Sequence, residues 1–142
     1  MFPAALNLRC NVYARKTGAN VIRLAFRGID GIVELEIDKL DDYRGLKIGN
    51  YQAGVAYFLA EKGVEIVGCD LFYDCTVPFG SGLSSSAAIE VGTAVALCEL
   101  AGVRYDSLRF FPNARKTNMR ASTVGLWTSL PRQWEKKTTP FC

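Results

Sequence analysis

Residues 77–88 combine a glycine-broken loop with a run of three serines, and together they could bind a phosphate group. Gly80 and Gly82 can adopt positive φ angles, which lets the backbone approach a ligand closely. The helix predicted from about residue 83 to residue 101 would present its free N–H groups and the positive end of its dipole to an anion. The serines at 84–86 add hydroxyl donors. Because a serine hydroxyl can also coordinate Mg²⁺, the segment suits a nucleoside triphosphate.

The simpler alternative is that the serines only cap a helix and the glycines only form a turn. The segment is not a Walker loop, because no Gly-Lys-Ser or Gly-Lys-Thr follows the glycines. The string from Pro78 to Ala87 resembles the nucleotide-phosphate loop of the GHMP kinases. This resemblance implies ATP and Mg²⁺ as ligands, with Ser86 as the Mg²⁺ contact. The nucleotide-binding residues that it implies are Pro78, Gly80, Ser81, Gly82, Leu83, Ser84, Ser85, Ser86 and Ala87.

Within the GHMP kinases the resemblance is strongest to the galactokinase branch. Residues 2–6, Phe-Pro-Ala-Ala-Leu, resemble the strand that follows the galactokinase signature, and residues 50–57 resemble the first helix. Residues 82–100 continue the loop into a further helix. Two departures are visible: Ile48-Gly49 replaces a Trp that usually precedes the Asn-Tyr pair, and Gln52 replaces a Pro.

The resemblance implies an activity and a fold. The activity is ATP-dependent phosphorylation of galactose at its anomeric hydroxyl. The fold is α+β, an antiparallel-rich sheet with helices on one face, and residues 1–110 form part of the amino-terminal GHMP domain. Another GHMP kinase, acting on mevalonate or homoserine, is the alternative enzyme, but the matches at residues 2–6 and 50–57 disfavour it.

Length and composition allow one globular domain with a real core. The chain has 142 residues, of which 49% are hydrophobic and 22% charged. It is short for a two-domain kinase. A net charge of +3, spread evenly, does not indicate a nucleic-acid partner. We find neither a secretory signal pattern nor an apolar run of about 18 residues, so we expect a cytoplasmic protein without a membrane partner.

The cysteines do not form a recognisable metal or disulfide pattern. Their number is five, no C-x-x-C spacing occurs, and the chain has no histidine. We therefore expect neither a zinc site nor a disulfide framework. Cys98 lies in an apolar helical stretch and is predicted to be a core residue.

The apolar periodicity predicts a strand, then the phosphate loop, then a helix. This is the context in which a loop can present its backbone to phosphate. Turn residues 16–20 separate the first two predicted strands, and Gly63 ends the first predicted helix. The predicted strands are 3–15, 21–27, 32–38 and 69–77, and the predicted helices are 50–62 and 83–101.

Two segments that the resemblance implies for catalysis do not occur in the 142 residues. One is a Gly-Glu-His-Thr-Asp-Tyr-like segment that holds the sugar hydroxyls. The other is a Gly-Ile-Met-Asp-Gln-like segment whose aspartate orients or deprotonates the attacking hydroxyl. Met1 immediately precedes residues 2–6, which predicts that translation begins after the first segment. No residue of this chain is therefore assigned a catalytic role.

Residues 111–142 have neither helical nor strand periodicity and are predicted to be a tail foreign to the family, read in a shifted frame. Joining the last base of each codon to the first two bases of the next turns Trp127-Thr128 into an Asp codon. The neighbouring codons can then encode Met and Gln, which restores Met-Asp-Gln. The alternative is a genuine but unfamiliar segment. As written, the chain is predicted to be an inactive fragment or pseudoenzyme that at best binds nucleotide or a partner.

Overall fold

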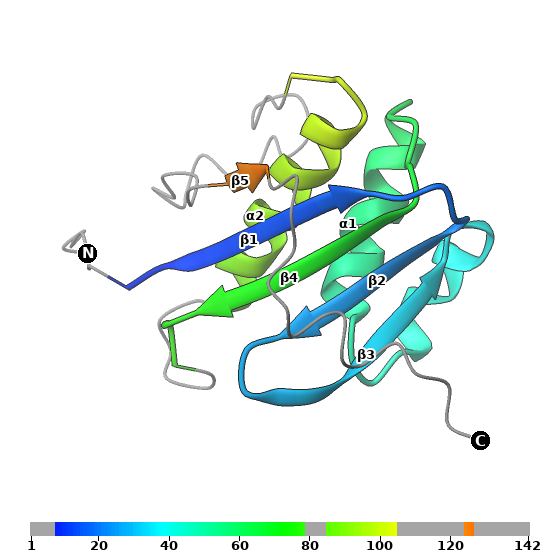
Figure 1. Ribbon diagram of the computed structural model, residues 1–142. Helices are drawn as coiled ribbons and strands as arrows, with labels where there is room; N and C mark the ends of the chain where they lie inside the picture. The colour runs from blue at the N-terminus through cyan, green and yellow to red at the C-terminus, as the bar shows by residue number, and fades with distance from the viewer. Residues whose placement is uncertain (1–7, 79–84, 105–123, 127–142) are drawn as a thin grey trace, which may run out of the picture.

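The computed structural model of the chain describes residues 8–78, 85–104 and 124–126. The described part contains a five-stranded sheet, two α-helices and a 3₁₀ helix (Figure 1). In chain order the elements are β1 (Cys10–Lys16), β2 (Val21–Phe26), β3 (Ile29–Glu36), η1 (Ile37–Gly45), α1 (Asn50–Glu61), β4 (Cys69–Cys75), α2 (Ser85–Leu100) and β5 (Val124–Leu126).

The sheet is mixed, with strand order β3-β2-β4-β1-β5. β1 pairs with β4 and β2 with β3 in antiparallel fashion, whereas β2 with β4 and β1 with β5 are parallel. Both helices lie on the same face of the sheet (Figure 1). The predicted α+β class with helices on one face is confirmed. The sheet is more evenly mixed than the predicted antiparallel-rich one, because α1 returns the chain so that β4 enters beside β2 in the same direction.

β4 lies between β1 and β2, so the turn that joins these two strands has to pass the start of β4. The amide of Thr17 donates a hydrogen bond to the carbonyl of Gly68 at 2.8 Å. A Cβ atom on Gly68 would lie 1.6 Å from the carbonyl oxygen of Ala19. Only glycine therefore allows this close passage of the turn over the chain that leads into β4.

The core lies between the sheet and the two helices. Alternate residues of each strand face the helices, as the period of two requires. α2 approaches β1 closely, because a Cβ atom on Gly92 would lie 2.7 Å from Cγ2 of Val12. The buried strand residues that face the helices are Cys10, Val12, Ala14, Ile22, Leu24, Leu35, Cys69, Leu71 and Tyr73.

The sheet face opposite α1 and α2 carries ion pairs. Asp70 of β4 is only 1% exposed, and its two carboxylate oxygens accept hydrogen bonds from Arg15 of β1 and Arg23 of β2. The Nε atoms of these arginines lie 3.1 Å and 2.7 Å from the carboxylate. Asp70 therefore links the three central strands across the face opposite α1 and α2.

The described elements agree with most of the sequence predictions. β3 begins three residues earlier than predicted, at Ile29, and ends at Glu36 because η1 takes over from Ile37. The predicted strand over 3–15 is observed from Cys10, while residues 3–7 lie outside the described part. β5 lies in the segment for which no regular structure was predicted, and three residues are too few to produce a periodic pattern.

Candidate functional site

The candidate site is the connection between the end of β4 and the start of α2. β4 ends at Cys75 and α2 begins at Ser85. Pro78 is exposed at one end of the connection, and Ser85, Ser86 and Ala87 are partly buried in the first turn of α2 at the other. The remaining predicted contacts, Gly80, Ser81, Gly82, Leu83 and Ser84, lie outside the described residues. The structure thus has the predicted strand and helix on the two sides of the loop.

Backbone bonds to the start of β1 hold the chain just before the loop. The amide of Thr76 donates to the carbonyl of Arg9 at 2.7 Å, and the amide of Arg9 donates to Oγ1 of Thr76 at 2.9 Å. The Thr76 hydroxyl also donates to the Arg9 carbonyl at 3.2 Å. Val77, the next residue, is buried. The loop therefore leaves a fixed backbone position near Pro78.

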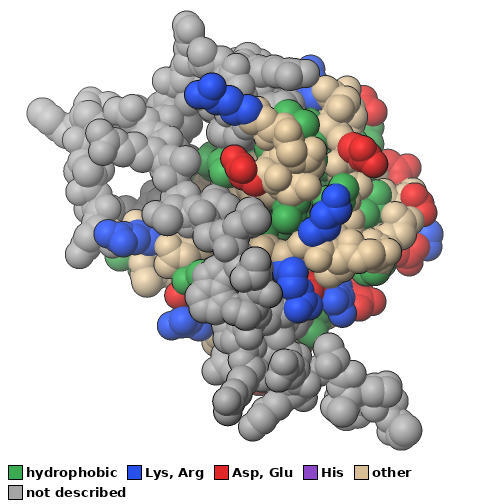
Figure 2. Space-filling model, turned by 45° about the horizontal axis from the view of Figure 1, so that its top comes forward, with side chains coloured by type: hydrophobic (Ala, Val, Ile, Leu, Met, Phe, Trp, Pro, Cys, Tyr) green, Lys and Arg blue, Asp and Glu red, His purple; other side chains and the backbone are tan. Residues whose placement is uncertain are grey.

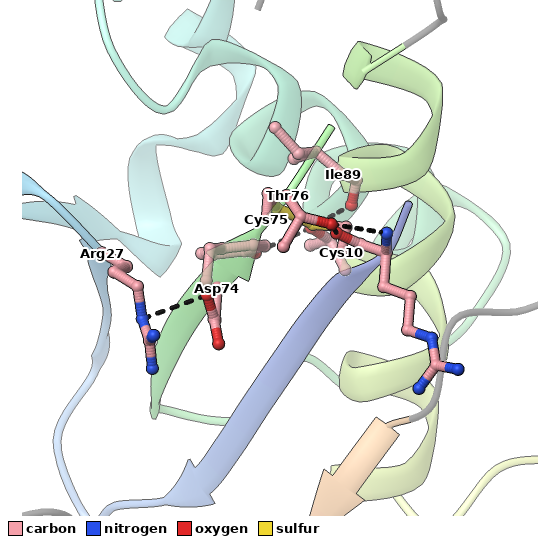
Figure 3. Close-up of a disulfide and its surroundings, with 9 residues drawn as sticks. Cys10, Arg27, Asp74, Cys75, Thr76 and Ile89 are labelled. Atoms are coloured by element: carbon pink, nitrogen blue, oxygen red, sulfur yellow. Dashed lines mark hydrogen bonds and ion pairs between the residues drawn. A yellow bond between two sulfur atoms is a disulfide. The ribbon is translucent and has the colours of Figure 1, made fainter. Parts of the chain in front are cut away.

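A disulfide between Cys10 and Cys75 joins the same two strands beside this position (Figure 3). The prediction that the cysteines form no disulfide framework is wrong for this pair. The two residues are 65 positions apart in the sequence, but they are register partners on the antiparallel strands β1 and β4. Their spacing along the chain does not predict that the two cysteines lie side by side, because only the pairing of β1 with β4 brings them together.

The other two described cysteines, Cys69 and Cys98, are buried thiols outside the disulfide. The predicted core position of Cys98 is confirmed. Burial, with a smaller contribution from the carboxylate of Asp70, raises the pKa of Cys69 to about 12. The Cys69 thiol is therefore protonated at neutral pH, and a buried protonated thiol is a poor nucleophile.

A buried polar network that no local sequence pattern predicts joins α2 to the sheet. The hydroxyls of Tyr73 in β4 and Thr93 in α2 lie 2.7 Å apart, and Thr93 donates to the carbonyl of Ile89 at 2.7 Å. The side chain of Gln52 in α1 also hydrogen-bonds to Tyr73. Burial raises the pKa of the Tyr73 phenol well above its ordinary range, which keeps it a neutral donor. Its one sign in the sequence is that Thr93 is a polar residue within an otherwise apolar helical stretch.

The start of α1 contains the two departures from the galactokinase pattern. Gly49 has a φ of 85°, and a Cβ atom there would lie 3.1 Å from Cδ1 of Leu24. Ile48 is exposed at the surface beside it. Gln52 is buried, and its bond to Tyr73 supplies the partner that a buried amide needs. A proline at position 52 could not make this contact.

The surface in view in Figure 2 mixes acidic and basic side chains around smaller green apolar areas. The described part contains no helix that is both long and apolar enough to cross a membrane.

Residues 50–125 match the family model for the GHMP kinases N terminal domain. The chain belongs to the GHMP kinase family. The matched segment includes α1, β4, the candidate loop and α2. The match runs to residue 125, while the domain boundary at residue 110 and the foreign tail over 111–142 stay predictions.

Several curated relatives of this GHMP kinase chain are galactokinases. The chain is 36% identical over 109 residues to a galactokinase of Ligilactobacillus salivarius, a match that covers 75% of this chain and 28% of the relative. It is 33% identical over 120 residues to a galactokinase of Streptococcus suis, covering 82% of this chain and 31% of that one. The chain thus spans about 30% of the length of these relatives.

Two solved structures superpose on this chain. A galactokinase of Lactococcus lactis complexed with galactose superposes with a TM-score of 0.65 at 29% identity, covering 73% of this chain and 28% of that structure. A mevalonate kinase of Methanococcus jannaschii superposes with a TM-score of 0.60 at 18% identity, covering 68% of this chain and 32% of that structure. The second comparison bears on the fold alone.

Proposed function

We propose that the loop between β4 and α2 binds the phosphates of ATP together with Mg²⁺. The observation that carries this proposal is the strand, loop and helix arrangement, in which the loop leaves a fixed backbone at Thr76 and ends at the start of α2. Membership of the GHMP kinases supports it.

The glycines, the serines and the start of α2 each contribute to the proposed phosphate site. Gly80 and Gly82 allow the backbone amides to approach the phosphates, while the first turn of α2 supplies unpaired N–H groups and the positive end of a helix of 16 residues. Ser81, Ser84 and Ser85 donate hydroxyl hydrogen bonds, and Ser86 contacts Mg²⁺. Pro78, Leu83 and Ala87 shape the loop and the helix start. The chemistry supplied by Mg²⁺ is neutralisation of phosphate charge.

The reaction we propose for the complete enzyme to which this sequence corresponds is transfer of a phosphoryl group from ATP to the anomeric hydroxyl of galactose. The support is the set of galactokinase relatives at 30–37% identity. Phosphoryl transfer depends mainly on positioning and on neutralising charge, so the loop would contribute by holding the donor in place. A mevalonate or homoserine kinase is less well supported, because the mevalonate kinase structure is only 18% identical.

A second candidate function is nucleotide binding without transfer. The observation that favours it is that the 142 residues contain neither a histidine nor a Met-Asp-Gln segment. We expect the purified 142-residue chain to release no ADP above the nucleotide-hydrolysis background when galactose and Mg·ATP are supplied. Turnover within the ordinary kinase range of about 1–100 s⁻¹ would show that this chain contains a complete active site.

Calorimetric titration of Mg·ATP into the purified chain tests the proposed loop. Gly82→Val places a β-branched side chain where the backbone should approach phosphate, and we expect it to weaken binding about tenfold or more, roughly 1.4 kcal/mol. Gly18→Val is the matched control, because a Cβ atom there meets nothing within 4 Å in the turn after β1. Equal affinity of the Gly82→Val chain and the wild type would mean that the loop only caps a helix.

Ser86→Ala separates the metal contact from the phosphate contact. We expect the variant to bind ATP without Mg²⁺ as the wild type does and to lose most of the gain that Mg²⁺ brings. An unchanged Mg²⁺ dependence would remove Ser86 from the proposed site.

A further inference from the structure

The Cys10–Cys75 disulfide lies where the chain leaves β4 for the candidate loop. Cys75 is the last residue of β4, and Pro78 follows three positions later. The neighbouring Arg9 and Thr76 exchange the hydrogen bonds that fix the backbone before the loop. The disulfide and these bonds thus restrain the same short stretch of chain.

The disulfide also lies close to α2, on the other side of the loop. Cys10 and Cys75 belong to the set of strand residues whose side chains face the helices; Cys10 is part of the core together with Ile89, and Cys75 is partly buried and packs against that core. Figure 3 shows Ile89 of α2 among the residues around the disulfide. A change at this bond therefore reaches the end of β4 and the first turns of α2 together.

Breaking the bond would have a local effect rather than a global one. Cys10↔Cys75 is the last register pair of the β1–β4 ladder, and the pairs from Asn11↔Asp74 to Lys16↔Cys69 need no disulfide. The backbone bonds of those pairs continue to hold the two strands. The end of the ladder beside the loop is the part that gains freedom, since terminal pairs open most easily.

We propose that Cys10 and Cys75 form a reversible redox tether that sets the affinity of the loop for nucleotide phosphate. This inference rests on the proposed function. In the oxidised form the loop leaves a restrained backbone, so less ordering is needed when phosphate binds. In the reduced form only the Arg9–Thr76 hydrogen bonds restrain this stretch, and the affinity for Mg·ATP falls.

The chemical step is thiol–disulfide exchange with a dithiol. Cys75 is the more exposed residue of the pair, so a thiolate of the dithiol attacks its Sγ atom, and the Sγ atom of the buried Cys10 leaves and takes up a proton. The second thiol of the reductant then displaces Cys75 as a thiol. The reductant becomes a disulfide and the protein gains two electrons and two protons.

Cys69 and Cys98 provide an internal comparison. Both are thiols buried in the same core, away from the end of the ladder beside the loop, so neither is positioned to replace a partner of the tether. Cys98→Ala is therefore a matched control that removes a buried thiol without touching the tether.

The experiment compares the oxidised chain with the chain reduced by dithiothreitol, with the redox state verified by mass spectrometry after alkylation. Two quantities are measured in each state: hydrogen exchange of the backbone amides and the affinity for Mg·ATP. We expect reduction to accelerate exchange at Thr76 and Val77 while the amides of residues 11–15 stay protected. We also expect a fivefold to tenfold loss of affinity.

Cys10→Ser and Cys75→Ser should behave like the reduced wild type and should no longer respond to dithiothreitol, whereas Cys98→Ala should respond fully.

Equal Mg·ATP affinity in the verified oxidised and reduced forms would overturn the proposal, as would thiols at Cys10 and Cys75 in the air-oxidised protein. If neither form binds Mg·ATP but exchange at Thr76 still responds to reduction, the tether is supported and the proposed function of the loop is wrong. An exchange pattern unaffected by reduction rejects the tether by a measurement that needs no nucleotide.

Discussion

The hydroxyl oxygens of Tyr73 and Thr93 lie 2.7 Å apart in the core, where they join β4 to α2. Thr93 donates to the carbonyl of Ile89, so the Tyr73 hydroxyl is the donor in the bond between the two side chains. β4 and α2 flank the candidate phosphate loop. The distance between the two ends of the loop therefore depends on a directional polar contact as well as on apolar packing.

Replacing Tyr73 with Phe should lower the free energy of unfolding by about 1–3 kcal/mol, because the buried side chains of Thr93 and Gln52 each lose the hydrogen bond to Tyr73. Urea denaturation measures the change, and Tyr51→Phe at a half-exposed position is the matched control. The double variant Tyr73→Phe, Thr93→Val should lose less than the sum of the single changes. Strictly additive losses would mean that the two hydroxyls do not act together.

Asp70→Asn should destabilise the chain by about 1–3 kcal/mol, since the carboxylate accepts charge-assisted bonds from both Arg15 and Arg23. Both arginines keep partial contact with solvent, at 41% and 26% exposure, which places the loss below that of a fully buried pair. Asp74→Asn is the control, because its partner Arg27 is 70% exposed and such pairs contribute less than about 1 kcal/mol. Thermal or urea unfolding compares the two, and equal losses would contradict a special role for Asp70.

The partly buried Glu90 on α2 should make the stability of the chain depend on pH. Burial raises the pKa of its carboxyl above the ordinary 4.5. Between pH 4.5 and the raised value, the folded chain holds a proton that the unfolded chain has released, so stability falls as pH rises through this interval. Glu90→Gln should therefore be more stable than the wild type at pH 7, and this advantage should shrink as the pH falls below 4.5.

Urea titrations at pH 7 and pH 4 measure the effect of Glu90→Gln. Glu65→Gln, at an exposed loop position, is the matched control. A gain for Glu90→Gln that is the same at both pH values would show that removal of the charge is not its cause.

The order of strand, loop and helix could be predicted from the sequence because local signals mark it. Alternating apolar residues indicate β4, and the apolar stretch after the serines indicates α2. This order indicates where the candidate loop lies, but not which contacts hold the chain on either side of it. Cys10 and Cys75 meet only because β4 pairs with β1, and no local pattern records a partner 65 residues away.

The same limit applies to single residues whose environment depends on other strands. Charged residues usually stay exposed, so Asp70 carries no sign in the sequence that two arginines from β1 and β2 enclose it. The sequence likewise does not indicate that Gly92 packs against Val12 of β1, because this contact depends on how α2 lies on the sheet. Sequence periodicity identifies which face of an element is buried, whereas these contacts require the strand order.

The coding sequence tests whether residues 111–142 are read in a shifted frame. If residues 111–142 are read in a shifted frame, restoring Met-Asp-Gln requires Leu126 to have a codon that ends in A, Thr128 to be ACC, and Ser129 to have a codon that begins AG. Trp127 already supplies the bases TGG, so the Asp codon follows without further choice. We therefore expect the nucleotide sequence to show these three codons and a galactokinase-like frame through residue 141. A Ser129 codon that begins TC, or a Leu126 codon that ends in any other base, would reject the shifted frame and make the tail a genuine segment of this protein.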